Sequence, residues 1–213
     1  MSASIDELRQ WAREHLSWFG FSAFRITTAG SRIFIDPFRV PSSAGPATLI
    51  LVTHPHRDHY DRSAIEGLRG ADTVVVLPMS CAASGQRGIA PGQTERIGAI
   101  KISGVPSYNV TKRFHPKSGA WLGYMVEVDD IRIYHAGDTD PLPDMDGLRP
   151  DIALLPVGGM FTMNWKAAAE LVSALGATLA IPMHFNALLG GKRTGQRFAA
   201  AVGAGGLVLP RTR

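Results

Sequence analysis

Apolar and polar positions divide the chain into short stretches of helical or extended period. The spacing of Ile5, Leu8, Ala12 and Leu16 predicts an amphipathic helix over residues 5–16. Runs rich in β-branched and aromatic residues, separated by turn-forming residues, predict strands instead. These are a hairpin in 21–38, single strands in 47–53, 73–77, 151–157, 177–183 and 206–210, two short strands in 95–108, and a hairpin in 121–136 that turns at Asp129-Asp130.

Two further helices are predicted in the C-terminal third of the chain. Apolar residues recur at helical spacing over 164–176, and Gly176 is placed to end this helix. Either Asn164 or Thr162 can cap its start. The last helix, TGQRFAAAVG, has Thr194 as its expected cap.

The order of these elements favours mixed sheets with helices packed on their outer faces. Hairpins occur at the start and in the middle, and helices lie between or after strands. No repeat, low-complexity segment or linker interrupts the sequence, so we expect a single domain over residues 1–213. The stretch 80–92 is rich in small residues and predicts no definite element.

Composition narrows the class of protein. Of 213 residues, 45% are hydrophobic and 19% charged, which is typical of a globular chain, and the net charge of +4 is too small to indicate nucleic-acid binding. Cys81 is the only cysteine, which excludes an internal disulfide and a multi-thiolate zinc site. No apolar run reaches 18 residues and no secretory signal opens the chain, so we expect a cytoplasmic protein without membrane association.

The histidines are clustered, and the cluster indicates a metal site. His54, His56 and His59 lie within six residues, together with Asp58, directly after a predicted buried strand. Pro55 favours an extended conformation at His54, so His54 and His56 should point to the same side. Surface histidines in a polar loop are the alternative, but such a dense cluster is rare by chance in a chain of this length.

The number of ligands in this cluster suggests more than one ion. A catalytic zinc ion usually has three protein ligands and one open position, so four candidates in one turn exceed the need of a single ion. His115, Asp138 and His184 lie in loops or after strands, where additional ligands could come from. Taken alone, each of these three has an ordinary explanation as a hydrogen-bonded histidine or a turn-forming aspartate.

The motifs THPHRDH, HAGDTD and PMHF, in this order, resemble the metallo-β-lactamase superfamily. The similarity is greatest to its small, lid-less metal-dependent hydrolases, the group that includes ascorbate-6-phosphate lactonase. IFIDP, YNVTKRFHP, AGDTDPLPDM and LLPVGGMFTMN add to the resemblance, which extends from about Trp18 to His184. Many members of this group have Gly-His near the first strand, where this chain has Gly20-Phe21.

The resemblance implies a four-layer αββα sandwich of two mixed sheets, with two divalent metal ions at one edge. Zn²⁺ is the first choice, and Mn²⁺ and Fe²⁺ are alternatives. Matched motif by motif, one ion would have His54, His56 and His115, and the other Asp58, His59 and His184. Asp138 would bridge the two ions.

The resemblance also implies a metal-dependent hydrolase. A metal-bridging hydroxide would attack an ester, lactone or phosphoester bond of a small substrate, with Asp58 orienting it and taking up its proton. Basic residues near the predicted ligands suggest an anionic substrate: Arg57, Lys112, Arg113, Lys117, Lys192 and Arg193. Two alternatives remain, a mononuclear iron oxidation catalyst on the same fold and a metal-binding module without turnover.

Three further residues have predicted roles other than metal ligand. Asp36 follows a predicted strand and is either an orienting partner of the ligand histidines or a turn-forming Asp-Pro. His135 is expected to be a structural neighbour of the site. His15 is expected to lie on a helix face. No pattern of base-stacking aromatic residues accompanies the basic residues, so nucleic acid is not an expected partner.

Overall fold

Strands form two mixed sheets in the computed structural model, which describes residues 3–186, 188–191 and 193–212. In the first sheet, β1 to β3 pair antiparallel and β3 to β6 pair parallel. In spatial order its strands are β1 (Leu16–Gly20), β2 (Ala23–Thr27), β3 (Arg32–Ile35), β4 (Leu49–Leu51), β5 (Val74–Pro78) and β6 (Arg87–Ile89).

The second sheet has the same mixture of pairings. Its strands β7 to β10 pair antiparallel, and β10 to β12 pair parallel. They are β7 (Thr94–Ile97), β8 (Ile100–Pro106), β9 (Leu122–Val128), β10 (Ile131–His135), β11 (Ile152–Pro156) and β12 (Leu179–Met183). The carboxyl ends of the parallel strands in each sheet therefore lie at one edge of that sheet.

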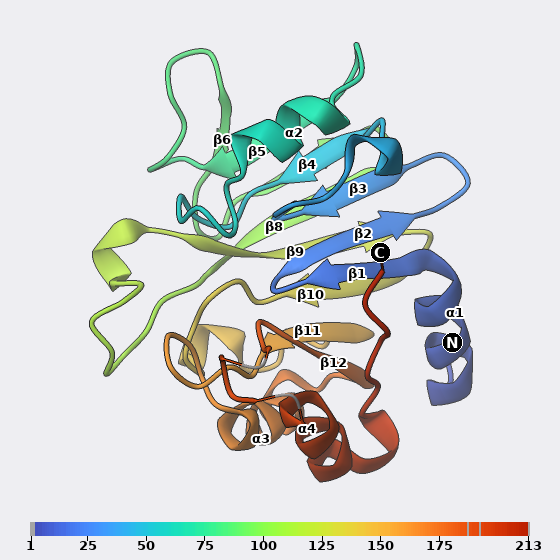
Figure 1. Cartoon of the computed structure of the whole chain (residues 1–213), viewed down its shortest axis with the longest axis vertical. Helices are drawn as coiled ribbons and strands as arrows, with labels where there is room; N and C mark the ends of the chain where they lie inside the picture. Colours follow the sequence, from blue (N-terminus) through green and yellow to red (C-terminus); the bar gives the residue numbers. More distant parts are fainter. Residues whose placement is uncertain (1–2, 187, 192, 213) are drawn as a thin grey trace.

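Helices cover the outer faces of both sheets (Figure 1). Helices α3 and α4 pack on β11 and β12, α2 lies over the outer face of the first sheet, and α1 contacts β1, β2 and β12. The helices are α1 (Ile5–His15), α2 (Arg62–Leu68), α3 (Trp165–Leu175) and α4 (Thr194–Val202), with short 3-10 turns η1 (Ser42–Ala44), η2 (Lys117–Gly119), η3 (Pro143–Met145) and η4 (Gly203–Gly205). The predicted αββα architecture is confirmed. Within the described ranges, no helix has both the length and the apolar character to cross a membrane.

Both faces of the central strands are buried, which explains their nearly continuous apolar sequences. Successive residues of a strand point to opposite faces. In β3, Ile33 and Ile35 therefore join the core between the sheets, whereas Phe34 packs in a second core with Ile65 and Leu68 of α2.

Several local predictions are confirmed by the structure. Asn164, rather than Thr162, caps α3, because its side chain accepts hydrogen bonds from the amides of Lys166 and Ala167. Gly176 ends this helix in the left-handed conformation, with φ 66°. The hairpin in 121–136 is β9 and β10, and Asp129 and Asp130 at its turn have positive φ angles of 50° and 60°.

Two predictions are wrong. Residues 206–210 form no strand, and the segment makes only an isolated bridge between Gly206 and Ala180. Its alternating Leu207 and Leu209 reflect side-chain burial without a backbone ladder. Thr194 is not the cap of α4 but its first residue, and its hydroxyl donates to the carbonyl oxygen of Gly190.

Two strands and one α-helix were not expected from the sequence. Strand β1 follows α1 without a turn, because the helix ends at His15 and Leu16 is already extended. Helix α2 has only seven residues, too few to display a helical period. Strand β6 lies in the Gly-rich stretch 80–92 and pairs with only β5.

Candidate metal centre

The predicted ligands lie just beyond the carboxyl ends of strands from both sheets. His54 is the third residue after β4, Asp138 the third after β10, and His184 the first after β12. His115 comes from the long loop between β8 and β9. Parallel pairing brings these strand ends to one edge, so residues far apart in sequence converge there.

Three histidines form the first group of the site. The Nε2 atom of His54 lies 3.0 Å from Nδ1 of His56, and that Nδ1 lies 3.2 Å from Nε2 of His115. Nitrogens bound at 2.0–2.1 Å to a tetrahedrally coordinated ion lie about 3.3 Å apart. The three nitrogens are thus spaced as ligands of one ion.

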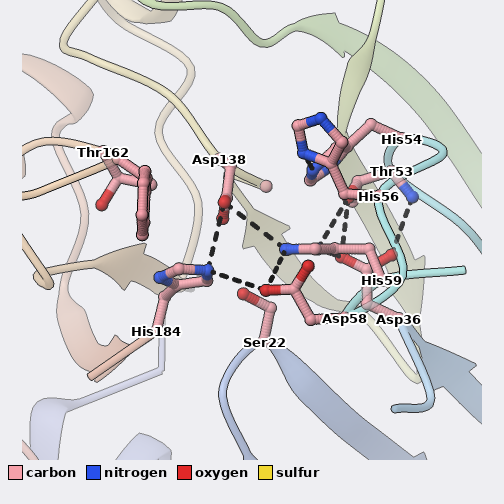
Figure 2. Close-up of polar contacts among 12 residues, drawn as sticks. Ser22, Asp36, Thr53, His54, His56, Asp58, His59, Asp138, Thr162 and His184 are labelled. Carbon is pink, nitrogen blue, oxygen red and sulfur yellow. Dashed lines mark hydrogen bonds and ion pairs between the residues drawn. The ribbon is translucent and has the colours of Figure 1, made fainter. Parts of the chain in front are cut away.

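Asp58, His59 and His184 form the second group (Figure 2). Oδ2 of Asp58 lies 3.7 Å from Nε2 of His59 and 3.5 Å from Nε2 of His184. His59 and His184 are almost completely buried, whereas the side chain of Asp58 is 36% exposed. The second group is therefore open to solvent on the side of Asp58.

Asp138 connects the two groups. Its Oδ2 atom lies 3.4 Å from Nε2 of His115, 3.4 Å from Nε2 of His59 and 3.1 Å from Nε2 of His184. One carboxylate oxygen is thus within reach of nitrogens from both groups. The structure brings all seven predicted ligands together.

Unpartnered buried atoms show that this donor set fits a cation. In the described chain, Nε2 of His59, Nε2 of His184 and Oδ1 of Asp138 are buried and have no hydrogen-bond partner of acceptable geometry. Leaving buried polar atoms without partners is costly in a folded protein. Imidazole nitrogens and carboxylate oxygens facing one another are the donors that Zn²⁺, Mn²⁺ and Fe²⁺ accept.

Asp36 orients two of the histidines through their Nδ1 atoms, His59 directly and His54 through Thr53. Its Oδ2 atom accepts from Nδ1 of His59 at 2.6 Å and from the hydroxyl of Thr53 at 2.6 Å, while its Oδ1 accepts the Thr53 amide at 2.8 Å. The Thr53 hydroxyl in turn lies 3.0 Å from Nδ1 of His54 and accepts its hydrogen. Asp36 therefore leaves Nε2 of both histidines as an acceptor facing the site.

The other ring contacts distinguish ligand candidates from structural histidines. Nδ1 of His115 donates to the carbonyl oxygen of Phe161 at 3.2 Å, which leaves Nε2 for the site. His135 uses both nitrogens elsewhere: Nε2 donates to the Ser22 carbonyl oxygen at 2.9 Å, and Nδ1 accepts the Gly137 amide. His15, at the end of α1, contacts the Thr27 carbonyl oxygen. Both therefore lie outside the ligand set, as expected.

The backbone around the site is strained. His115, His184 and Asp36 have positive φ angles of 57°, 53° and 47°, a region that non-glycine residues rarely adopt. A glycine makes room for one of them, because a Cβ atom at Gly158 would lie 2.4 Å from the His184 carbonyl oxygen. Such strain concentrates where side chains must be held in one direction.

Comparison with known proteins agrees with the fold. The family model described as beta-lactamase superfamily domain matches residues 15–184, and this range contains all seven predicted ligands. The chain belongs to the metallo-β-lactamase superfamily. The small, lid-less subgroup predicted from the sequence motifs is also confirmed.

Relatives of this superfamily match the chain over most of its length. A UPF0173 metal-dependent hydrolase from Caldivirga maquilingensis is 33% identical over 187 residues, which cover 81% of this chain and 82% of the relative. A solved structure from Parabacteroides distasonis has a TM-score of 0.81 at 28% identity and covers 91% of this chain and 90% of its own. The structure of a metallo hydrolase from Ignicoccus hospitalis has a TM-score of 0.71 at 26% identity and covers 88% of this chain and 89% of its own.

A tryptophan that the sequence did not single out packs against the metallo-β-lactamase site. The ring of Trp121 stacks on His54 with centroids 5.1 Å apart, and it meets His56 and His115 edge-on at 5.1 and 5.7 Å. In the sequence, Trp121 is simply the first residue of a predicted strand. No sequence signal therefore distinguishes it from an ordinary core residue.

Of the basic residues expected near the ligands, those that the structure describes do not line the cavity above the site. Arg57 borders a separate cavity with Arg62 and Trp121. Lys112 pairs with Asp140, and Lys117 lies over the ring of Tyr108. Lys192 is outside the described residues, and neither Arg113 nor Arg193 contributes to the cavity wall.

Burial and neighbouring charges shift the pKa values of the predicted ligands. Burial opposes a charge on His184, but the Asp138 carboxylate outweighs it and raises the pKa of His184 to about 9. Burial would also raise the pKa of Asp138, yet His184 and His59 hold it well below its usual range. Burial and the neighbouring His59 lower the pKa of His54. The Asp138 carboxylate thus favours positive charge at His184, in the group where a cation would bind.

We expect Asp36→Asn to weaken metal binding by about 10- to 100-fold, because the neutral amide polarises His59 and His54 less than a carboxylate does. Competition with a chromophoric chelator measures the affinity. Asp140→Asn is the control: Asp140 is also buried, but it pairs with Lys112 instead of a ligand histidine. Equal losses in the two variants would contradict an orienting role for Asp36.

We expect metal-free protein to lose free energy of unfolding as the pH rises from about 6.5 to 9. The pKa of His184 is higher in the folded chain than the ordinary 6.5, so its stabilising proton is fully present below pH 6.5 and lost towards pH 9. Urea denaturation of chelator-treated protein measures this slope, and His184→Asn should flatten it. Zinc-loaded protein should show the opposite sign, because protons compete with the metal. A rising stability of the metal-free protein would contradict the expectation.

Proposed function

We propose that the protein is a metal-dependent hydrolase that acts on a small molecule. The observation that carries the proposal is the position of Asp138, with Oδ2 within 3.4 Å of candidate ligand atoms in both groups. Such an arrangement suits two neighbouring ions better than one. The metal-dependent hydrolase from Caldivirga maquilingensis, 33% identical over 187 residues, supports the same class of reaction.

In this proposal each group would hold one divalent ion. His54, His56 and His115 would supply three nitrogens to the first. Asp58, His59 and His184 would supply one oxygen and two nitrogens to the second, and Asp138, within reach of both groups, would serve both ions. Zn²⁺ suits this donor set best, with Mn²⁺ or Fe²⁺ as alternatives. When bound, such ions supply Lewis acidity, which lowers the pKa of a coordinated water to about 7 and draws electron density from a substrate oxygen.

Asp58 is the residue best placed to handle a proton. It lines the cavity above the site, and its side chain is more exposed than that of Asp138. Burial acts to raise its pKa, but the contact with His184 and the charge of His59 lower it overall. Asp58 is therefore ionised at neutral pH, and it can orient an attacking water and accept its proton.

The charges of the site favour reactions in which negative charge develops on oxygen. Asp58 and Asp138 contribute two negative charges, against four positive charges from two divalent ions. Attack on the carbonyl carbon of an ester or lactone, or on the phosphorus of a phosphoester, places charge on a substrate oxygen near this net positive centre. We therefore propose these bonds as the targets.

Metal analysis coupled to a substrate panel tests the proposal. After loading, we expect close to two transition-metal ions per chain and turnover of an ester, lactone or phosphodiester. Asp138→Ala should bind fewer ions and lose turnover while circular dichroism shows an intact fold, whereas the exposed Asp144→Ala should match wild type. Protein that binds no metal would refute the proposal. A single iron with oxidative turnover would favour the oxidation catalyst, and two ions without any turnover the non-catalytic module.

Two substitutions separate the proposed proton transfer by Asp58 from its metal binding. Asp58→Asn and His184→Asn each remove one ligand of the same group. If Asp58 also accepts a proton, kcat of Asp58→Asn should fall about 100-fold further than that of His184→Asn at equal metal occupancy. Steady-state kinetics with metal content measured on the same samples gives the comparison. Equal losses would assign Asp58 to metal binding alone.

A further inference from the structure

The cavity above the metal centre has a polar floor and an apolar wall. It has a volume of about 480 Å³. Its polar floor is the part lined by His56, Asp58, His115, Asp138 and His184. Its apolar wall is the part lined by the other described residues apart from Asn186, which are Phe21, Phe114, Phe161, Leu188 and Leu189.

The apolar wall is exposed to solvent to a degree that packing does not explain. Phe114 is 48% exposed and Leu188 is 87% exposed, although both are large hydrophobic residues. Phe114 meets Phe161 edge-on, with ring centroids 4.8 Å apart. Contiguous exposed apolar side chains beside a polar centre are typical of a ligand-binding surface.

The wall offers no charged partner to a ligand. Among the described residues, no lysine or arginine lines this cavity. Asn186 is the one uncharged amide side chain of the described lining, and its Oδ1 accepts the amides of Leu188 and Leu189 at 2.7 and 2.9 Å. Asn186 thus fixes the loop that carries the two leucines.

We propose that the cavity selects substrates in which an uncharged apolar group, about the size of an aromatic ring, adjoins the bond to be cleaved. The apolar group lies against Phe114, Phe161 and Leu188, and the cleavable bond faces Asp58 and Asp138. This inference deepens the proposed hydrolase function and rests on it for the identity of the bond. The binding preference of the wall is independent of turnover.

Binding of an uncharged probe to metal-free protein tests the wall by itself. N-phenyl-1-naphthylamine should bind saturably to wild type, with a rise in fluorescence. Phe114→Ala and Phe161→Ala should each weaken binding by at least about fivefold. Met79→Ala is the control, because Met79 is also exposed, at 54%, but lies outside this cavity. Absence of saturable binding, or equal binding by all variants, would overturn the inference.

A matched pair of esters tests the same preference in metal-loaded protein. We expect kcat/KM for phenyl acetate to exceed that for 4-acetoxybenzoate, whose aromatic ring carries a carboxylate, by about tenfold or more. Phe161→Ala should bring the two values together. Equal wild-type values would overturn the inference while leaving the hydrolase intact. A third outcome is saturable probe binding that Phe161→Ala weakens, without turnover of either ester. It would support the proposed binding preference of the wall and contradict only the proposed hydrolase function.

A second copy of the chain is the competing occupant of the wall. If the exposed residues were buried in a dimer, sedimentation velocity would show that the wild type is a dimer and that the Leu188→Ala variant is a monomer. That result would overturn the inference. Wild type and Leu188→Ala with the same sedimentation coefficient would support a free wall.

Discussion

The metal centre depends on one buried carboxylate. Asp36 is completely buried at the end of β3. Burying a carboxylate there without hydrogen-bond partners would destabilise the fold. Hydrogen bonds from His59 and Thr53 stabilise the buried carboxylate. Through Thr53, Asp36 also orients His54. Because His54 belongs to one group and His59 to the other, a single side chain sets the ring orientation in both halves of the site. Its left-handed backbone, with φ 47°, is the local cost of that position.

The two sheets make unequal contributions to this arrangement. The first sheet delivers the dense cluster after β4 and the orienting Asp36 after β3, while the second delivers Asp138 and His184 after β10 and β12. Asp138 is the point at which they meet, since its Oδ2 faces nitrogens from both. The site is therefore complete only when the sheets pack together, and the apolar core between them is a precondition of metal binding.

The sequence predicted which side chains converge at the site better than it predicted their surroundings. His54, His56, Asp58 and His59 share one turn, and a dense local pattern is visible in a single chain. His115, Asp138 and His184 needed the family motifs, because spacing alone does not bring distant strand ends together. Strand β1 and helix α2 were missed, since one follows a helix without a turn and the other is too short to show a period. Trp121, Phe114 and Phe161 had no local signal, because their roles arise from loops that meet only in the folded chain.

The apolar wall and the charged floor act on each other. An apolar group seated against Phe114 and Phe161 would displace water from the cavity mouth, on the side where Asp58 is exposed. Removing water lowers the effective dielectric around Asp58 and Asp138, and every electrostatic interaction there becomes stronger. A substrate with a charged tail would keep that water in place and would find no lysine or arginine in the described lining to compensate it. Selection for an apolar group and strengthening of the charged centre are therefore two consequences of the same surface.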